Sequence, residues 1–204
     1  MRPPTPRLVL SVTLAALASP AAHAACALKD VFPSGVYTYR MSGPSPSTYT
    51  TTNAARSNSV TSTTTVAGTT TSMTWACTAK GLTGTMSTGG KDNLTTTSSA
   101  FLPPLNVWRP GYSWKSDQNV NMGGGITAKS TSVNKIVKRE SVKVPAGTFT
   151  AWRLDTTSTM TMTLPGSSAP KTTTIKSSVW YAPGTGMIRS ENSGVTTELV
   201  KVKR

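Results

Sequence analysis

The sequence predicts an all-β domain made of antiparallel strands. Threonine and serine dominate the chain and alternate with apolar residues, and β-branched threonine fits a pleated strand better than a helix. Short alternating segments are separated by Gly, Pro and Asn turn signals, which is the pattern of antiparallel sheets. Beyond the first 24 residues, no stretch has the apolar spacing of a helix.

The N-terminal segment, residues 1–24, has the layout of a secretory signal peptide. Arg2 and Arg7 precede an apolar run over residues 8–18, which is too short to cross a membrane, and small residues flank the expected cleavage point after Ala24. We therefore expect an exported single domain over residues 25–204, in the periplasm, at the cell surface or in the medium. We expect no transmembrane segment.

Cleavage at this point removes the only histidine, His23. A mature chain without imidazole lacks the commonest general base and the commonest zinc and copper ligand. We therefore expect a protein that is not an enzyme, with no catalytic residue, no metal and no cofactor.

Cys26 and Cys77 are the two cysteines of the chain. In an oxidising compartment they are expected to form a disulfide. It would close a loop of roughly 50 residues and stabilise the fold by about 4 kcal/mol. Lipidation of Cys26 is the alternative, although His23 stands where a lipoprotein signal has an apolar residue.

The chain is strongly basic. Without Arg2 and Arg7, 19 basic residues stand against 7 acidic ones, a net charge of +12. Such a charge favours anionic partners such as lipid head groups or an acidic envelope polysaccharide. We expect no specific recognition of nucleic acid. The competing interpretation is that lysines spread over solvated strand faces simply keep the protein soluble.

The first half of the chain is expected to hold four strands and a loop. The strands lie at residues 36–41, 57–66, 71–78 and 82–86, and residues 87–99, rich in Gly, Thr and Ser, predict an exposed loop. Residues 101–105 cannot form a central strand, because Pro103 and Pro104 lack backbone donors.

The clearest strand spans residues 148–164. Its period of two places five large apolar side chains on one face: Trp152, Leu154, Met160, Met162 and Leu164. Such a length requires a strand that coils around something, or a bulge near residues 156–158. Pro145 and Gly147 predict a tight hairpin before it, Pro183-Gly184 predicts a type II turn, and residues 195–203 predict a final strand.

Several catalytic and metal-binding motifs are only partly matched. Residues 123–130 miss a phosphate-binding loop by one glycine, and residues 132–135 fit S-x-x-K without the helix that would aim the serine. Met160 and Met162 are more typical of an irregular core than of a Cu(I) site. A hydrolase that uses a carboxylate pair stays open as an alternative, drawn from the seven acids: Asp30, Asp92, Asp117, Glu140, Asp155, Glu191 and Glu198.

Large aromatic rings near turns are the other notable group. They are either the core of a twisted sheet or the lining of a sugar or lipid site: Trp75, Trp108, Trp114, Trp152, Trp180 and Tyr181.

Three ordered segments resemble a bacterial group of exported proteins, the DUF3108-like or TapB-type families. They are Leu102-Pro103 with residues 111–114, residues 142–149 with 152–154, and residues 180–189 ahead of 198–200. The resemblance covers about residues 100–200. It implies a single antiparallel, strongly curved sheet that forms a half-open barrel similar to the LolA/LolB lipoprotein carriers, and it implies no catalytic residues.

The leading hypothesis is an envelope protein that binds a lipid or another apolar ligand in the curved sheet. Its candidate ligand-binding residues are Trp114, Trp152, Leu154, Met160, Met162, Trp180 and Tyr181. The first alternative is a surface module that binds acidic polysaccharide or another polyanion. The second is the carboxylate-pair hydrolase.

Overall fold

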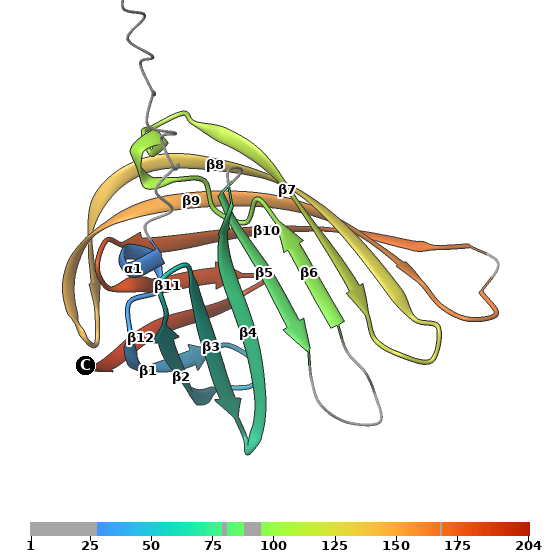
Figure 1. The fold of residues 1–204 in the computed structure, drawn as a ribbon, viewed down its shortest axis with the longest axis horizontal. Coiled ribbons are helices and arrows are strands. Elements are labelled where there is room, and N and C mark those ends of the chain that lie inside the picture. The colour runs from blue at the N-terminus through green and yellow to red at the C-terminus, as the bar shows by residue number, and fades with distance from the viewer. Residues whose placement is uncertain (1–27, 79–80, 88–94, 168) are drawn as a thin grey trace, which may run out of the picture.

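The computed structural model describes residues 28–78, 81–87, 95–167 and 169–204. Over this part of the chain the fold is a single antiparallel sheet of twelve strands closed into a barrel (Figure 1). The predicted all-β class and the antiparallel pairing are confirmed. The expected signal peptide, residues 1–24, and Cys26 lie outside the described residues, so cleavage and the Cys26–Cys77 disulfide stay predictions.

The sheet follows chain order almost throughout. The elements are α1 (Leu28–Val31), β1 (Gly35–Ser42), β2 (Ser47–Ala55), β3 (Ser59–Val66), β4 (Thr69–Thr78), β5 (Gly81–Ser87), β6 (Thr95–Ser99), η1 (Leu105–Val107), β7 (Ser113–Asn121), β8 (Thr127–Val144), β9 (Gly147–Thr163), β10 (Lys171–Ala182), β11 (Gly186–Asn192) and β12 (Val195–Lys203). Each strand pairs with its sequence neighbours, and the one pairing between distant segments joins β1 to β12.

The β1–β12 ladder corrects the expected half-open barrel, because it closes the sheet. Its register runs from Val36 opposite Lys203 to Ser42 opposite Thr196, with one irregularity between Thr38 and Tyr39. The expectation of an open sheet came from a resemblance limited to the C-terminal half. The threonine-rich N-terminal half contributes six strands, including β2, which was not predicted.

The expected exposed loop over residues 87–99 is also wrong in part. Residues 95–99 form β6, which pairs with β5 and β7, and its Thr96 and Ser98 are buried. The alternation of this strand is invisible in hydropathy because its inward residues are small and polar rather than apolar. Residues 88–94 of the same segment lie outside the described residues.

The long strand and its two hairpins agree closely with the prediction. β9 pairs with β10 from Trp152 to Met162 without a register shift, so the strand coils and has no bulge near residues 156–158. The irregularity lies in β8, between Ile136 and Lys138. Gly184 has φ of 74°, and the Thr185 N–H donates to the Ala182 carbonyl at 2.9 Å, as in a type II turn.

The two ends of the barrel differ. The C-terminal ends of β1, β3, β5, β7, β9 and β11 point to one end of the barrel, and the other end receives α1 and residues 100–112 (Figure 1). α1 is held there because the Gly184 N–H donates to the Asp30 carbonyl at 2.9 Å. Leu28 and Val31 of α1 are buried, as are Leu102 and Trp108. These segments form a plug at one end of the barrel.

Apolar side chains pack in two clusters. The first cluster joins the plug to the barrel wall, with Trp75 and Leu154 among its buried members. The second gathers around Ile188 and Leu199, where the β8–β9 hairpin reaches β12 and the Ala146 N–H donates to the Leu199 carbonyl at 3.0 Å.

One backbone contact in the first cluster tests this packing. Gly84 lies under the indole of Trp75, and a Cβ at residue 84 would lie 2.6 Å from Cζ3 of that ring. We expect Gly84→Ala to lower the free energy of unfolding by about 1–3 kcal/mol, because the ring must move against its neighbours. Urea denaturation measures the change.

The matched control is Thr85→Ala, which alters the neighbouring, exposed position on the opposite face of β5. An equal effect of the two variants would contradict the close contact between β5 and Trp75.

Candidate functional site in the barrel interior

The barrel is hollow beyond the plug. A first cavity of about 460 Å³ lies among the inner faces of β1–β5 and the β10–β11 hairpin. Its wall is rich in methionine and aromatic side chains, with a few threonines: Met41, Met73, Met86, Met187, Tyr39, Tyr49, Thr51, Thr64 and Thr71. A concave, mostly apolar space of this size is typical of a site for a small ligand.

Stacked aromatic rings close this cavity on the plug side. Phe32, just after α1, stacks on Trp75 with ring centroids 5.0 Å apart, and Phe101 lies 4.6 Å from the same indole. Tyr181 and Trp108 meet edge to face at 6.1 Å behind them. The plug segments and β4 together therefore make an aromatic floor.

A second cavity of about 400 Å³ lies beside the first, along β6–β10. The two share Met73, Trp75, Phe101 and Tyr181 in their walls. The second wall mixes apolar side chains such as Trp114, Leu154 and Val179 with a set of hydroxyl and amide side chains: Ser98, Ser116, Gln118, Ser132, Asn134, Thr156, Ser158 and Ser177. The second cavity therefore carries more hydroxyl and amide groups than the first, and methionine is concentrated in the first.

The polar side is ordered by hydrogen bonds between strands. Thr156 Oγ1 donates to Asn134 Oδ1 at 2.8 Å, and Asn134 Nδ2 donates to Ser116 Oγ at 2.9 Å. The hydroxyls of Ser132 and Ser158 lie 2.6 Å apart. Asn134 and Ser116 are buried, so these partners offset the cost of removing the two side chains from water.

The interior is also almost without charge. No Asp, Glu, Lys or Arg lines the first cavity, and Asp117 is the one such residue along the second. Burial raises the pKa of the Tyr39 and Tyr181 phenols far above their ordinary value, so both stay neutral. The described interior therefore offers hydroxyls, amides, thioethers and rings, and no cation.

The structure separates the seven candidate ligand-binding residues. Tyr181 lines both cavities, and Trp114 and Leu154 line the second. Trp152 lies opposite Tyr181 and packs against the first cluster without lining either cavity. Met160 and Met162 continue the face of Leu154, further toward the β9–β10 turn, and are half-buried.

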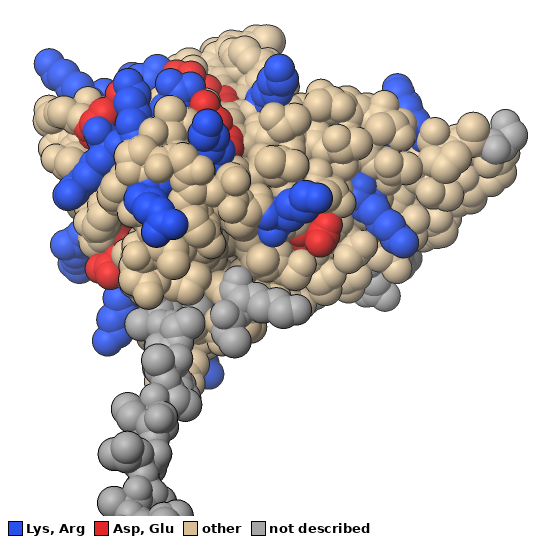
Figure 2. Space-filling view, turned by 90° about the horizontal axis from the view of Figure 1, so that it is seen from above, with Lys and Arg blue, Asp and Glu red and all other residues tan. Residues whose placement is uncertain are grey.

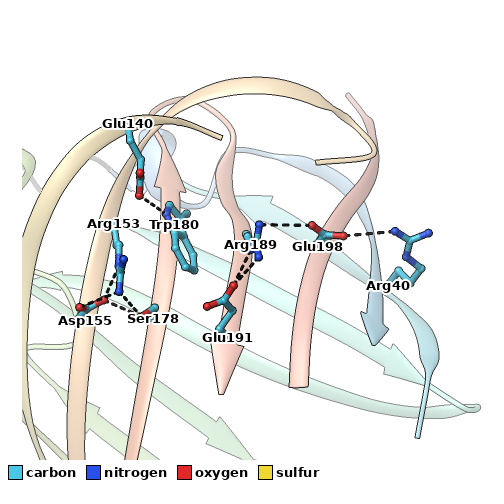
Figure 3. A network of polar contacts seen from close by, with 9 residues as sticks. All are labelled: Arg40, Glu140, Arg153, Asp155, Ser178, Trp180, Arg189, Glu191 and Glu198. Atoms are coloured by element: carbon cyan, nitrogen blue, oxygen red, sulfur yellow. Dashed lines mark hydrogen bonds and ion pairs between the residues drawn. The ribbon is translucent and has the colours of Figure 1, made fainter. Parts of the chain in front are cut away.

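Trp180 lies apart from both cavities. It is buried in the second cluster, and its Nε1–H donates to Glu140 Oε1 at 2.8 Å (Figure 3). The guanidiniums of Arg153 and Arg189 each lie 5.4 Å from the centre of its ring, in the range of a cation–π contact.

Most of the methionine and aromatic wall was missed from the sequence. Met41, Tyr49, Met73, Met86 and Phe101 all come from the first half of the chain. A signal was present, because Tyr37, Tyr39 and Met41 alternate in one strand, as do Met73 and Trp75 in another. The sequence alone does not show that the barrel closes, so it could not place these residues opposite the candidate residues of β9.

The outer face carries a charged network across six strands. Figure 3 shows Arg40, Glu198, Arg189 and Glu191 linked across β1, β12 and β11, and Arg153 held by Asp155 beside Ser178. These side chains are between about a fifth and a half exposed, so each pair stabilises the fold by at most about 1 kcal/mol.

Charge is unevenly distributed over the wall of the barrel. The strands β2–β6 contain no charged residue, and their outer faces are mainly threonine and serine. Among the strands, lysine and arginine are carried by β1 and β7–β12, and Figure 2 shows many of them at the end with the β8–β9 turn.

Among the described acids, two lie near each other on the outer face of the sheet. Asp155 and Glu191 lie on the same face, two strands apart, and each is engaged by an arginine. Among the described residues, no three His, Cys, Asp or Glu side chains meet as a metal site.

Comparison with known proteins supports the resemblance seen in the sequence. Residues 113–202 match the family model DUF3108-like, which confirms that resemblance over this range. A comparison with curated proteins gives no match. Within the described residues, no helix has the length and apolar content needed to cross a membrane.

Two solved structures share the fold. A Bacteroides fragilis protein, described as exported and of YmcC-like fold, has a TM-score of 0.57 at 16% identity, covering 86% of this chain and 99% of its own. A Parabacteroides distasonis protein, described as a lipoprotein, has a TM-score of 0.57 at 13% identity, covering 86% and 98%. At these identities the likeness shows a common architecture.

Acid titration tests the network around Trp180. Contacts from Lys138 and then from the Trp180 indole lower the pKa of the Glu140 carboxyl. A carboxyl with a lowered pKa stabilises the fold above its unfolded-state pKa near 4.3, and this contribution is lost as pH falls through the folded-state pKa. We expect Glu140→Gln to be less stable than wild type at pH 7, and this difference to shrink in acid.

Urea denaturation at several pH values measures this difference in stability. Trp180→Phe is the matched variant, because it removes the indole N–H contact with Glu140 and keeps the Lys138 contact. A stability difference for Glu140→Gln that stays constant down to pH 2 would contradict the assignment.

Proposed function

We propose that this protein is a non-enzymatic component of the cell envelope that binds an apolar ligand inside its barrel. The observation that carries the proposal is the cavity of about 460 Å³ walled by methionine and aromatic side chains. Methionine is flexible and polarisable, so this wall suits a ligand of variable shape such as an acyl chain. The aromatic floor would stop the far end of such an acyl chain.

The expected export to the envelope has two supports. The sequence begins with the layout of a signal peptide, and the two proteins of similar fold are described as exported and as a lipoprotein. Periplasm and cell surface fit equally. Either state of Cys26 fits as well: a disulfide to Cys77 would tie the N-terminus to β4, and lipidation would tether the barrel to a membrane.

Ligand occupancy is the direct test. We expect the gently extracted protein to carry a co-purifying lipid in native mass spectrometry, and the emptied protein to bind a fluorescent fatty-acid probe. Met73 borders both cavities, so Met73→Trp should fill the space between them and weaken probe binding at least tenfold.

The matched control is Thr74→Trp, which adds the same ring at the neighbouring, exposed position on β4. A wild-type protein with no bound lipid and no probe binding would refute the proposal, as would equal binding by the two tryptophan variants.

Polyanion binding is the second candidate, and the one-sided charge distribution favours it. Basic residues follow β7–β12 while β2–β6 have none, so an acidic polysaccharide would meet one side of the barrel. Arg40, Arg153 and Arg189 are already paired with carboxylates. The attraction would therefore depend on dispersed lysines.

Salt dependence distinguishes such binding from a specific polysaccharide site. We expect the protein to adsorb to an anionic polysaccharide column at low ionic strength and to elute by about 0.5 M salt, where the Debye length is only a few ångströms. Retention well above that concentration would contradict generic attraction and indicate specific contacts.

A further inference from the structure

We infer that the ligand is an amphiphile whose polar part is uncharged and rich in hydroxyls, with its apolar chain in the first cavity and its polar part in the second. This inference rests on the proposed function and names the chemical class of the ligand. It follows from two adjacent cavities that share four wall residues, of which the first has more methionine and the second more hydroxyl and amide groups.

The second cavity is built to meet neutral polar groups. Each serine or threonine hydroxyl can donate one hydrogen bond and accept two, and the Asn134 amide can donate two. The bonds from Thr156 and to Ser116 use one acceptor site and one donor of Asn134, which leaves capacity on the same side chain. The hydroxyls of a sugar or glycerol can therefore donate hydrogen bonds to these side chains or accept hydrogen bonds from them.

An anionic head group does not fit this space. Neither cavity wall contains a lysine or arginine, and the acidic residue along the second, Asp117, already accepts a hydrogen bond from Thr131 Oγ1 at 2.9 Å. A carboxylate or phosphate moved there from water would find no cation, and that transfer costs several kcal/mol. The basic residues lie on the outside of the barrel, where the ion pairs of Figure 3 are found.

The residues shared by the two cavities mark the junction between chain and head group. Met73 and Phe101 present apolar surface there, and the Trp75 and Tyr181 rings lie in the same wall. Aromatic rings can pack against the C–H face of a sugar as well as against an acyl chain. The junction therefore suits the first sugar or glycerol unit of a neutral lipid.

Isothermal titration with probes of one chain length separates head group from chain. The probes are dodecyl glucoside, dodecanoate and dodecyl phosphate, each below its micelle concentration. We expect dodecyl glucoside to bind at least tenfold more tightly than either anion. Asn134→Leu should weaken glucoside binding about tenfold and leave dodecanoate binding unchanged, and Asn119→Leu on the exposed face of β7 should change neither.

Ser158→Ala is a milder second variant, since it removes one hydroxyl of the Ser132–Ser158 pair, and it should weaken only glucoside binding. Binding of dodecanoate as tight as that of glucoside would overturn the inference and leave the proposed function standing. Binding of none of the three probes would refute both. Equal losses for Asn134→Leu and Asn119→Leu would also overturn the inference.

Discussion

The pairing of β1 with β12 is the constraint on which the rest of the structure depends. It joins segments more than 150 residues apart and turns a long meander into a closed wall, so the sheet has no unpaired edge. Closure places Tyr39 against Leu199 and brings the N-terminal strands opposite β8 and β9. Without it, the methionine and aromatic side chains of β1–β5 would have no facing surface and no interior would exist.

The two cavities inside the closed wall differ in composition, with methionine concentrated in the first and serine and amide side chains in the second. The N-terminal half supplies Met41, Tyr49 and Met73, and the C-terminal half supplies Ser132, Asn134 and Ser158. Charge is confined to the outside, where arginine–carboxylate pairs link neighbouring strands. The inner face of the sheet therefore presents apolar and hydroxyl groups, and the outer face carries the charged groups.

Sequence patterns predicted local structure well, but they could not predict the pairing of strands that lie far apart in the chain. The alternation around Leu154 and the Pro183-Gly184 turn gave β9 and the β10–β11 hairpin nearly to the residue, because period and turn chemistry are local properties. Thr96 and Ser98 were missed because buried polar side chains look like a loop in hydropathy. Trp180 was expected near the ligand because of its size, yet it precedes Tyr181 in the same strand, so the two side chains point to opposite faces and Trp180 lies with the outer arginines.

The central claim is that the closed barrel holds a ligand rather than a solid core. A crystal structure of the protein purified from its native envelope, without detergent exchange, tests it most directly. The account predicts elongated non-protein density running from Met86 past Met73 to Asn134. An interior filled by the protein's own side chains, with Met73 packed against Asn134 and no room for density, would contradict it.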